Sequence, residues 1–336
     1  MSAVDTSSPL RVLDALNSFQ RTFALKAAIE LDLFRHIAAG ATRAPEIAAR
    51  AQASDKGVRV LCDYLTICGF LHKQGDSYAL AADTALFLDS RSPAYVGAGV
   101  FFLAHPRNVA FFADLTEAVR RGGTAHGRGN LDTEAPIWVD FARWMAPLSA
   151  LAASAVADVV NRPGQAMKVL DIAAGHGAYG LAIARLNPRA EIYAQDWKNV
   201  LELARERAEQ AGAAARYHLI PGDAFQVELG SGYDVALLPN FLHHFDQPTN
   251  VGLLRRVREA LAPGGQAAVV EFVPDDDRVA PAAAAAFSLT MLASTERGDA
   301  YTFRELEAML REAGFGAARA RAVGPQTLVL AERSER

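Results

Sequence analysis

The sequence predicts an α/β protein in two parts: a helical N-terminal domain ending in a small hairpin, and a C-terminal domain built on a mainly parallel sheet. In the first part apolar residues recur at helical spacing, as Val12, Leu16 and Phe23 do. After Pro163-Gly164, short β-rich runs alternate with helical stretches, which is typical of strand–helix–strand units. A length of 336 residues is sufficient for both parts to bury a core.

The composition is that of an ordinary soluble globular protein. Hydrophobic residues make up 51% and charged residues 21%, and the net charge is −4, which gives no electrostatic reason to expect nucleic acid as a partner. No apolar run reaches the roughly 18 residues of a membrane span, and the first nine residues lack the pattern of a secretory leader. The cysteines, Cys62 and Cys68, have neither disulfide nor metal-site spacing. We therefore expect a cytoplasmic protein with no membrane partner and no metal.

Residues 1–95 are predicted to form a winged helix. Helices are expected over 12–23, 27–37, 45–51 and 55–68, and strands over 70–73 and 77–80. Thr42 and Ser54 are the expected N-caps, and Gly69 ends the last helix. A winged helix can bind DNA, but residues 1–90 carry nine Lys/Arg against ten Asp/Glu, a net charge of −1. Because a helix in a DNA groove needs basic residues to neutralise phosphates, packing or dimerisation is the preferred interpretation.

Residues 96–160 are predicted to be aromatic-rich helices interrupted by a loop at residues 121–124. Their large aromatic side chains are expected mostly in the core, with a subset walling a pocket for a flat ligand. These residues are Phe101, Phe102, Phe111, Phe112, Trp138, Phe141 and Trp144. The segment is therefore expected to link the two parts and to contribute to a substrate pocket.

Residues 161–336 contain the predicted sheet. Strands are expected over 168–172, 191–195, 216–220, 233–238 and 266–273, and helices over 179–186, 200–210 and 250–261. A final pair of strands, 317–323 and 327–331, flanks a hairpin-length turn. This pair is expected to place an antiparallel strand at the edge of the sheet.

A glycine loop follows the first of these strands, and acidic residues end three strands in succession. Gly175, Gly177 and Gly180 match a dinucleotide fingerprint, which is a weak signal by itself. Asp196 can accept hydrogen bonds from ribose hydroxyls, and Asp223 from an adenine amino group. Asp171 lies where the amino end of a methionine moiety would be. Three carboxylates suit a cationic cofactor with an amino group better than a pyrophosphate, which favours S-adenosylmethionine over a nicotinamide.

The order and spacing of five motifs make the resemblance specific. They are the glycine loop, Gln195-Asp196-Trp197, Gly222-Asp223-Ala224-Phe225, Leu261-Ala262-Pro263-Gly264-Gly265 and Glu312-Ala313-Gly314-Phe315. Residues 165–335 resemble class I S-adenosylmethionine-dependent methyltransferases. Residues 10–335 resemble the small-molecule O-methyltransferases that have an N-terminal winged-helix dimerisation domain. The resemblance implies a Rossmann-like, seven-stranded sheet with a reversed final strand, and a homodimer.

The resemblance also implies a set of cofactor-binding residues. These are Asp171, Ala173, Gly175, Gly177, Asp196, Trp197, Asp223, Ala224, Phe225 and Asn240. Ala173 and Ala174 stand where relatives usually have glycine, and alanine is small enough to fit. Pro239-Asn240 stands where plant enzymes often have a lysine, so other donors are expected to hold the carboxylate of the cofactor.

His243 is the predicted catalytic base, and Glu271 is predicted to orient it. A neutral hydroxyl attacks a methyl group poorly, and an imidazole near neutral pH is suited to take its proton. By the resemblance, His243 aligns with the base of plant relatives and Glu271 with a family acid, whereas the second orienting acid is replaced by Ala300. His244, Met291, Thr295 and Trp144 are predicted to contact the substrate, and Tyr301 is a further candidate for the pocket wall.

Several functions remain open at this point. O-methylation of a small, aromatic or polyketide-like molecule is the leading prediction. C-methylation is the alternative, because a carbon nucleophile depends less on a second acid. The fold could also have been recruited for decarboxylation, pericyclic chemistry or binding alone. A nicotinamide oxidoreductase and a winged-helix regulator are the remaining candidates.

Overall fold

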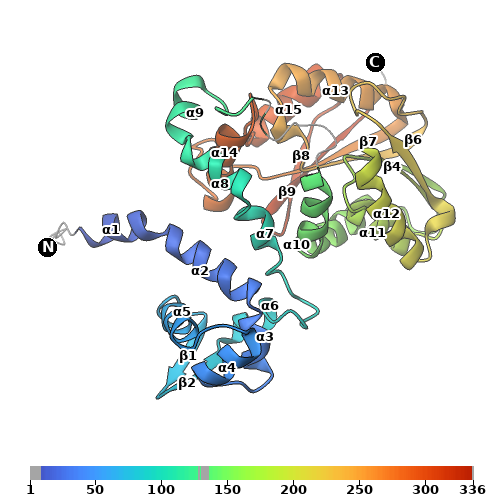
Figure 1. Cartoon of the computed structure of the whole chain (residues 1–336). Helices are drawn as coiled ribbons and strands as arrows, with labels where there is room; N and C mark the ends of the chain where they lie inside the picture. Colours follow the sequence, from blue (N-terminus) through green and yellow to red (C-terminus); the bar gives the residue numbers. More distant parts are fainter. Residues whose placement is uncertain (1–8, 128, 130–135, 335–336) are drawn as a thin grey trace, which may run out of the picture. The chain divides into compact units, whose positions relative to one another are not determined.

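The computed structural model describes residues 9–127, 129 and 136–334. The chain divides into two compact units, Met1–Pro106 and Arg107–Arg336, whose elements Figure 1 labels. Among the described residues, no helix has the length and apolar character needed to cross a membrane. The expected α/β class, with a helical N-terminal part, is confirmed.

Helices and one hairpin make up the first unit. In chain order the elements are α1 (Leu10–Asn17), α2 (Phe19–Glu30), α3 (Leu33–Ala38), α4 (Ala44–Ala51), α5 (Asp55–Ile67), β1 (Leu71–Gln74), β2 (Ser77–Leu80), α6 (Ala82–Phe87) and α7 (Gly99–Leu103). The predicted cap at Ser54 is present, since its hydroxyl accepts from the amide of Gly57. Strands β1 and β2 pair in antiparallel register from Leu71↔Leu80 to Gln74↔Ser77. Buried side chains from α2 to α5 and from the hairpin form one core.

Three details of the first unit differ from the sequence prediction. The helix expected over 12–23 is divided at Ser18 into α1 and α2, and α2 continues to Glu30. The next helix therefore starts only at Leu33, after Asp32 with its left-handed φ of 51°. The N-cap of α4 is Arg43 rather than Thr42. The reason is that Glu46 accepts hydrogen bonds from both of these amides, so its side chain satisfies the helix start.

The second unit contains seven strands with helices between them. Its helices are α8 (Pro106–Ala113), α9 (Leu115–Arg121), α10 (Pro136–Val160), α11 (Ala178–Leu186), α12 (Lys198–Gln210), α13 (Gln247–Ala260), α14 (Ala282–Ser294) and α15 (Phe303–Glu312). Its strands are β3 (Met167–Ile172), β4 (Ala190–Asp196), β5 (Tyr217–Pro221), β6 (Tyr233–Pro239), β7 (Leu261–Glu271), β8 (Arg319–Val323) and β9 (Gln326–Glu332). Two short 3₁₀ turns, η2 (Ala214–Arg216) and η3 (Leu242–His244), complete it.

The strand order is β5-β4-β3-β6-β7-β9-β8. Strands β3 to β7 are parallel, and β9 is antiparallel to both β7 and β8, so the reversed final strand is confirmed. The hairpin lies at the edge of the sheet, as expected. Strand β9 pairs with β7, and β8, which is antiparallel to β9, is the edge strand. This placement matters for the site, because it puts Gln326, the first residue of β9, inside the sheet.

Helices cover both faces of the sheet. Apolar side chains of α10, α11 and α12 pack with Val169 and Ile192 on one face. Side chains of α13 and α15 pack with Leu170 and Ile172 on the other, and Figure 1 shows the two helix layers on opposite sides. Alternate residues of β3 therefore enter different cores, as a strand buried on both faces requires. The carboxyl ends of β3 and β6 are neighbours, and the chain crosses over there, which is where α/β sheets place ligands.

Candidate functional site

The glycine loop leaves β3 through a run of left-handed residues. Ala173, Gly175 and Gly177 have φ values of 52°, 58° and 77°. Only glycine adopts this conformation without strain, so the alanine is the exception. A Cβ on Gly175 would meet nothing closer than 4.0 Å, so the space before the loop is open. A Cβ on Gly177 would come within 2.5 Å of the hydroxyl of Tyr217. The first glycine therefore exposes backbone to a ligand, and the second allows the loop to pack on β5.

Asp196 ties the glycine loop to the end of β4. Its Oδ2 accepts from the amide of Gly175 at 2.8 Å, and its Oδ1 accepts from the amide of Trp197 at 2.7 Å. Burial raises the pKa of Asp196 to about 6, although both hydrogen bonds lower it. A carboxylate in this position retains lone pairs with which it can accept from a ribose hydroxyl.

Asp171 is fully buried in β3. Its Oδ2 accepts from the amide of Gly180 at 3.1 Å, whereas its Oδ1 has no hydrogen-bond partner among the described residues. Burial raises the pKa of Asp171 to about 7, and the charge of Asp196 raises it further, against the hydrogen bond from Gly180. A buried carboxyl oxygen without a partner is costly unless a ligand satisfies it. A cationic amine fits this requirement.

The third acid lies at the end of the neighbouring strand. Asp223 accepts from the amide of Phe225 at 2.9 Å and from the side chain of Gln226 at 3.1 Å. Phe225 packs edge-on against Phe245 at 4.8 Å between ring centroids, and Phe241 lies 5.1 Å from Phe245. This aromatic cluster, next to the buried Ala224, provides an apolar surface of the kind a purine ring needs. The sequence-predicted acids Asp171, Asp196 and Asp223 thus end three adjacent strands, β3, β4 and β5.

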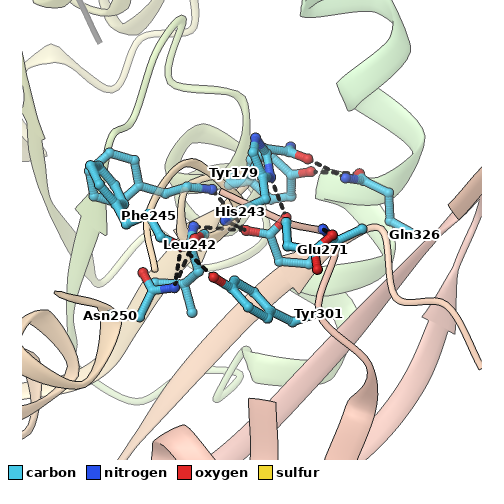
Figure 2. A network of polar contacts seen from close by, with 12 residues as sticks. Tyr179, Leu242, His243, Phe245, Asn250, Glu271, Tyr301 and Gln326 are labelled. Carbon is cyan, nitrogen blue, oxygen red and sulfur yellow. Dashed lines mark hydrogen bonds and ion pairs between the residues drawn. The ribbon is translucent and has the colours of Figure 1, made fainter. Parts of the chain in front are cut away.

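His243 and Glu271 are in direct contact, as the sequence predicted. The Nδ1 atom of His243 lies 2.6 Å from Oε2 of Glu271, and both residues are buried (Figure 2). With Nδ1 donating to a carboxylate, the neutral ring carries its lone pair on Nε2. That nitrogen is the one able to take a proton from an acceptor. The ring also packs edge-on against Phe287 of α14 at 4.9 Å, which fixes its plane.

The same carboxylate shapes the loop that carries the histidine. Oε1 of Glu271 accepts from the amides of Phe241, Leu242 and His243 at 3.0, 2.9 and 3.3 Å. These are the amides at the start of η3, which have no partner within so short a turn. Glu271 therefore sets both the path of the loop and the tautomer of the His243 imidazole.

Two residues that the sequence analysis did not assign to this loop hold its carbonyl groups. Asn250 of α13 donates to the carbonyl of Leu242 at 2.9 Å and to that of Phe245 at 3.3 Å. Tyr301 donates to the carbonyl of Phe245 at 2.5 Å, and Figure 2 shows both below the histidine. Tyr301 was expected only as a pocket wall. For Asn250, the one signal in the sequence is an asparagine inside a helix, where it is a poor helix former.

Gly298 lies against the backbone of the base. A Cβ at this position would come 2.1 Å from the carbonyl oxygen of His243. The amide of Gly298 donates to Oγ1 of Thr295 at 2.9 Å, and that hydroxyl donates to the carbonyl of Met291 at 2.7 Å. The hydroxyl of Thr295 is thus used to hold the turn after α14. Because Thr295 is fully buried, contact with a substrate would require this end of α14 to open.

Of the remaining predicted substrate residues, only His244 has a described contact with His243. His244 lies 4.3 Å from the ring of His243, and its ring meets the edge of Trp138 at 6.0 Å. Burial, with the charge of His243 added, lowers the pKa of His244 well below its usual 6.5, so this imidazole is neutral. Met291 is buried in α14, and Trp144 is partly exposed on α10. Trp138, which was expected mostly in the core, is thus one of the aromatic residues in contact with the His243–His244 pair, together with Phe287 and Phe245.

The position expected for a second orienting acid is Ala300, and it is buried. The described residues contain no group of three or more side chains that could hold a metal ion.

Comparison with known proteins gives one consistent result. The model of an O-methyltransferase domain matches residues 112–316, and that of an O-methyltransferase dimerisation domain matches residues 13–90. The chain is 31% identical to 3-hydroxy-5-methyl-1-naphthoate 3-O-methyltransferase of Streptomyces sahachiroi, over 91% of this chain and 89% of the relative.

Two solved structures extend the similarity to the fold. A protein of Nostoc punctiforme, assigned as an O-methyltransferase, superposes with a TM-score of 0.94 at 46% identity, over 98% of this chain and 100% of the other. The structure of PigF with SAH (S-adenosylhomocysteine) superposes with a TM-score of 0.86 at 25% identity, over 97% and 100%. PigF is a protein of a Serratia strain.

Proposed function

Because the chain belongs to the O-methyltransferase family, in which the cofactor is S-adenosylmethionine, we propose that His243 is the base for methyl transfer to a hydroxyl of a small aromatic molecule. The relative from Streptomyces sahachiroi is named for a hydroxynaphthoate. A fused-ring phenol of this kind is the proposed acceptor class. The contact between His243 and Glu271 is the observation on which the proposal rests.

When bound, S-adenosylmethionine supplies a methyl group activated on a sulfonium sulfur. We assign the amino group of the cofactor to Asp171, the ribose to Asp196 and the adenine to Asp223, with Trp197, Ala224 and Phe225 packing around the nucleoside. The open backbone at Gly175 admits the methionine portion, with Ala173 and Gly177 beside it in the same loop. The partnerless Oδ1 of Asp171 supports the first of these assignments, because a protonated amine would satisfy it.

His243 then acts on the acceptor. Its Nε2 takes the hydroxyl proton as the oxygen attacks the methyl carbon, and the resulting imidazolium is stabilised by the carboxylate of Glu271. With the cofactor bound, its sulfonium would supply the methyl group to the acceptor oxygen and would be left as a neutral thioether, so the transfer would require no further charge to be neutralised at sulfur. Phe287 holds the imidazole ring of His243 by packing against it, and Glu271 holds it by a hydrogen bond. Positioning by these two residues contributes to the rate in addition to the proton transfer.

The acceptor is proposed to lie against an aromatic and thioether surface. His244 contacts the ring of His243, and Trp138 contacts His244. Met291 belongs to α14, the helix whose Phe287 packs on His243, and Trp144 lies further along α10 than Trp138. A neutral imidazole at His244 suits an uncharged aromatic ring, because it adds no charge that would have to be desolvated.

The test is to incubate the purified protein with isotopically labelled S-adenosylmethionine and a panel of hydroxynaphthoates and simpler phenols. Label on oxygen, identified by the carbon chemical shift of the new methyl group, supports the proposal. Label on carbon would assign C-methylation instead. Binding of S-adenosylhomocysteine without label transfer to any acceptor would favour a recruited fold.

We further propose that the protein is a homodimer assembled through a winged-helix module in the first unit. The exposed faces of α1 and α2 carry large apolar side chains, namely Leu10, Val12, Leu13, Leu16, Phe19 and Phe23. Leu16 is 67% exposed and Phe19 is 59% exposed, which is costly for side chains of this kind in water. Next to them, α2 and α5 border a groove of about 560 Å³ lined by Ala24, Val60 and Tyr64. Both cysteines are free thiols, which is compatible with the proposed cytoplasmic location.

A further inference from the structure

Three polar side chains from distant parts of the chain meet beside the glycine loop. The hydroxyl of Tyr179, in α11, donates to Oε1 of Gln326 at 3.4 Å, and Nε2 of Gln326 donates to Oδ1 of Asn240 (Figure 2). Gln326 opens β9, and Asn240 follows β6 directly. The network therefore connects α11, the helix after the glycine loop, with the segment that leads into the loop 241–245, which carries His243.

The network is buried and directional. Tyr179 is 4% exposed and Gln326 is 8% exposed, so neither group can exchange its partner for water. Burial raises the pKa of Tyr179, and the charges of Asp171 and Glu271 raise it further, whereas a hydrogen bond from Asn240 lowers it. The phenol of Tyr179 therefore keeps its proton and acts as a hydrogen-bond donor. Because Tyr179 donates to Gln326, the oxygen of the Gln326 carboxamide must face Tyr179, and its NH₂ group then faces Asn240.

This arrangement orients the carboxamide of Asn240. With its oxygen held by Gln326, the Asn240 side chain presents its NH₂ group to its remaining surroundings. An amide nitrogen has two N–H groups, and the phenol oxygen of Tyr179 is a neighbouring acceptor for one of them. The backbone of Asn240 is fixed as well, since its amide donates to the carbonyl of Val270 at 2.8 Å and its φ of 55° is left-handed. One N–H therefore remains for a ligand.

The ligand group that this donor suits is a carboxylate. Asn240 lies at the carboxyl end of β6, next to β3, at the crossover where the cofactor is proposed to bind. Asp171 and Glu271 are acidic neighbours of the network, so a ligand carboxylate here needs a donor to offset them. An amide donor provides this without a charged side chain.

We propose that Gln326 is a positioning residue of the cofactor site, which holds the Asn240 carboxamide with its N–H directed at the methionine carboxylate of S-adenosylmethionine. This inference rests on the proposed placement of Asn240 beside the methionine portion of the cofactor. It assigns a function to the turn of the C-terminal hairpin, which lies 86 residues beyond Asn240 in the sequence.

The substitution Gln326→Glu tests the direction of the hydrogen bonds. A glutamate still accepts from Tyr179 but cannot donate to Asn240. The Asn240 amide would then turn its NH₂ group to the new carboxylate and present its oxygen to the ligand. Gln326→Leu removes both hydrogen bonds while retaining the approximate size of the side chain. Arg321→Ala, at an exposed position of the same hairpin, is the control.

Two ligands distinguish the loss of a contact to the methionine carboxylate from general damage to the cofactor site. S-adenosylhomocysteine carries the methionine carboxylate, and 5′-methylthioadenosine carries the same nucleoside and sulfur without it. Calorimetry should show that Gln326→Glu and Gln326→Leu weaken S-adenosylhomocysteine roughly tenfold or more, as expected for a hydrogen bond to a charged group. Binding of 5′-methylthioadenosine should stay within about twofold, which also shows that the site is folded. In turnover, KM for S-adenosylmethionine should rise more than kcat falls.

Asn240→Ala distinguishes the possible failures. It should weaken S-adenosylhomocysteine as Gln326→Leu does, and combining the two should add nothing, since both act on one contact. If Asn240→Ala leaves S-adenosylhomocysteine binding unchanged, the placement of Asn240 in the cofactor site is wrong. If Asn240→Ala weakens binding but the Gln326 variants do not, or if they weaken both ligands equally, the positioning role of Gln326 is wrong.

Discussion

The two carboxylate oxygens of Glu271 have different partners. Oε1 accepts from three consecutive amides, and Oε2 lies 2.6 Å from Nδ1 of His243. The two residues are 28 positions apart and come from different strand ends. Any change at the end of β7 should therefore affect the path of the loop 241–245 and the tautomer of His243 together.

Replacing His243 by alanine should lower kcat by about 10²–10⁴-fold, the usual contribution of a general base. The dissociation constant of S-adenosylhomocysteine should stay within about twofold, because His243 is assigned to the acceptor. Product formation under saturating cofactor and calorimetric titration are the two measurements. An unchanged kcat would remove the assignment of His243 as base.

Glu271→Gln should impair catalysis through the wrong tautomer. The amide oxygen can still accept from the loop, but its NH₂ group would donate to Nδ1 of His243 and move the imidazole proton to Nε2. We expect kcat to fall by on the order of 10²–10⁴-fold with a modest loss of thermal stability. Glu259→Gln, at an exposed position of α13, is the matched control and should change neither quantity. Full activity of Glu271→Gln would show that the tautomer is set by something else.

Asp171 should make the stability of the cofactor-free protein depend on pH. Its pKa is raised to about 7 in the folded protein, so between about pH 4 and 7 the folded chain holds a proton that the unfolded chain releases. The free energy of unfolding should therefore fall as pH rises through this window, by at most about 4 kcal/mol. Asp196, with a pKa raised to about 6, acts in the same direction. Melting curves of Asp171→Asn should show a flatter pH dependence than wild type.

A cationic amine at Asp171 reverses this preference, because it favours the ionised carboxyl. Binding of S-adenosylhomocysteine should therefore release protons near pH 6–7 and tighten as pH rises through about 7. Titrations in buffers of different ionisation enthalpy measure the proton release directly. Proton uptake on binding would contradict the assignment of the amine to Asp171.

Gly298→Ala should disturb the base without touching a catalytic side chain. The new Cβ would come 2.1 Å from the carbonyl oxygen of His243, so the loop must shift. We expect a loss of stability of about 1–3 kcal/mol and a reduced kcat. Gly252→Ala in α13 provides the control, since nothing lies within 4 Å of its Cβ, and it should stabilise the protein by roughly 0.5–1 kcal/mol. Equal effects of the two substitutions would rule out the close approach as the cause.

The double substitution Leu13→Glu/Leu16→Glu should convert the proposed dimer to a monomer. Charges on the exposed apolar face of α1 would be buried without partners in an interface. Light scattering coupled to size-exclusion chromatography gives the mass, and Val279→Glu, an exposed apolar position of the second unit, should leave it unchanged. A wild-type protein that elutes as a monomer would contradict the dimer.

Features set by residues close together in the sequence were predicted better than features set by contacts between distant segments. Four of the five parallel strands were predicted to within one residue at each end, because each is a short apolar run bounded by turn residues, whereas β7 starts five residues before its predicted start. The cap at Ser54 was correct because capping is local. The division at Ser18 and the cap at Arg43 were not predicted, because apolar periodicity continues across the first and a glutamate side chain decides the second. The terminal hairpin was placed correctly at the edge of the sheet, but the sequence did not predict which of its two strands pairs with β7, since nothing within a hairpin specifies this.

The sequence by itself determined the α/β class, the glycine loop, the three strand-end acids and the pairing of His243 with Glu271. These follow from local pattern and from the rule that parallel strands bring their carboxyl ends to one edge. Only the tertiary structure decided which groups complete the site: Asn250 and Tyr301 on the catalytic loop, Gly298 behind the base, and Gln326 beside Asn240. The physical reason is that buried polar groups must find partners wherever the packed elements place them, and these partners come from segments that have no common pattern in the sequence.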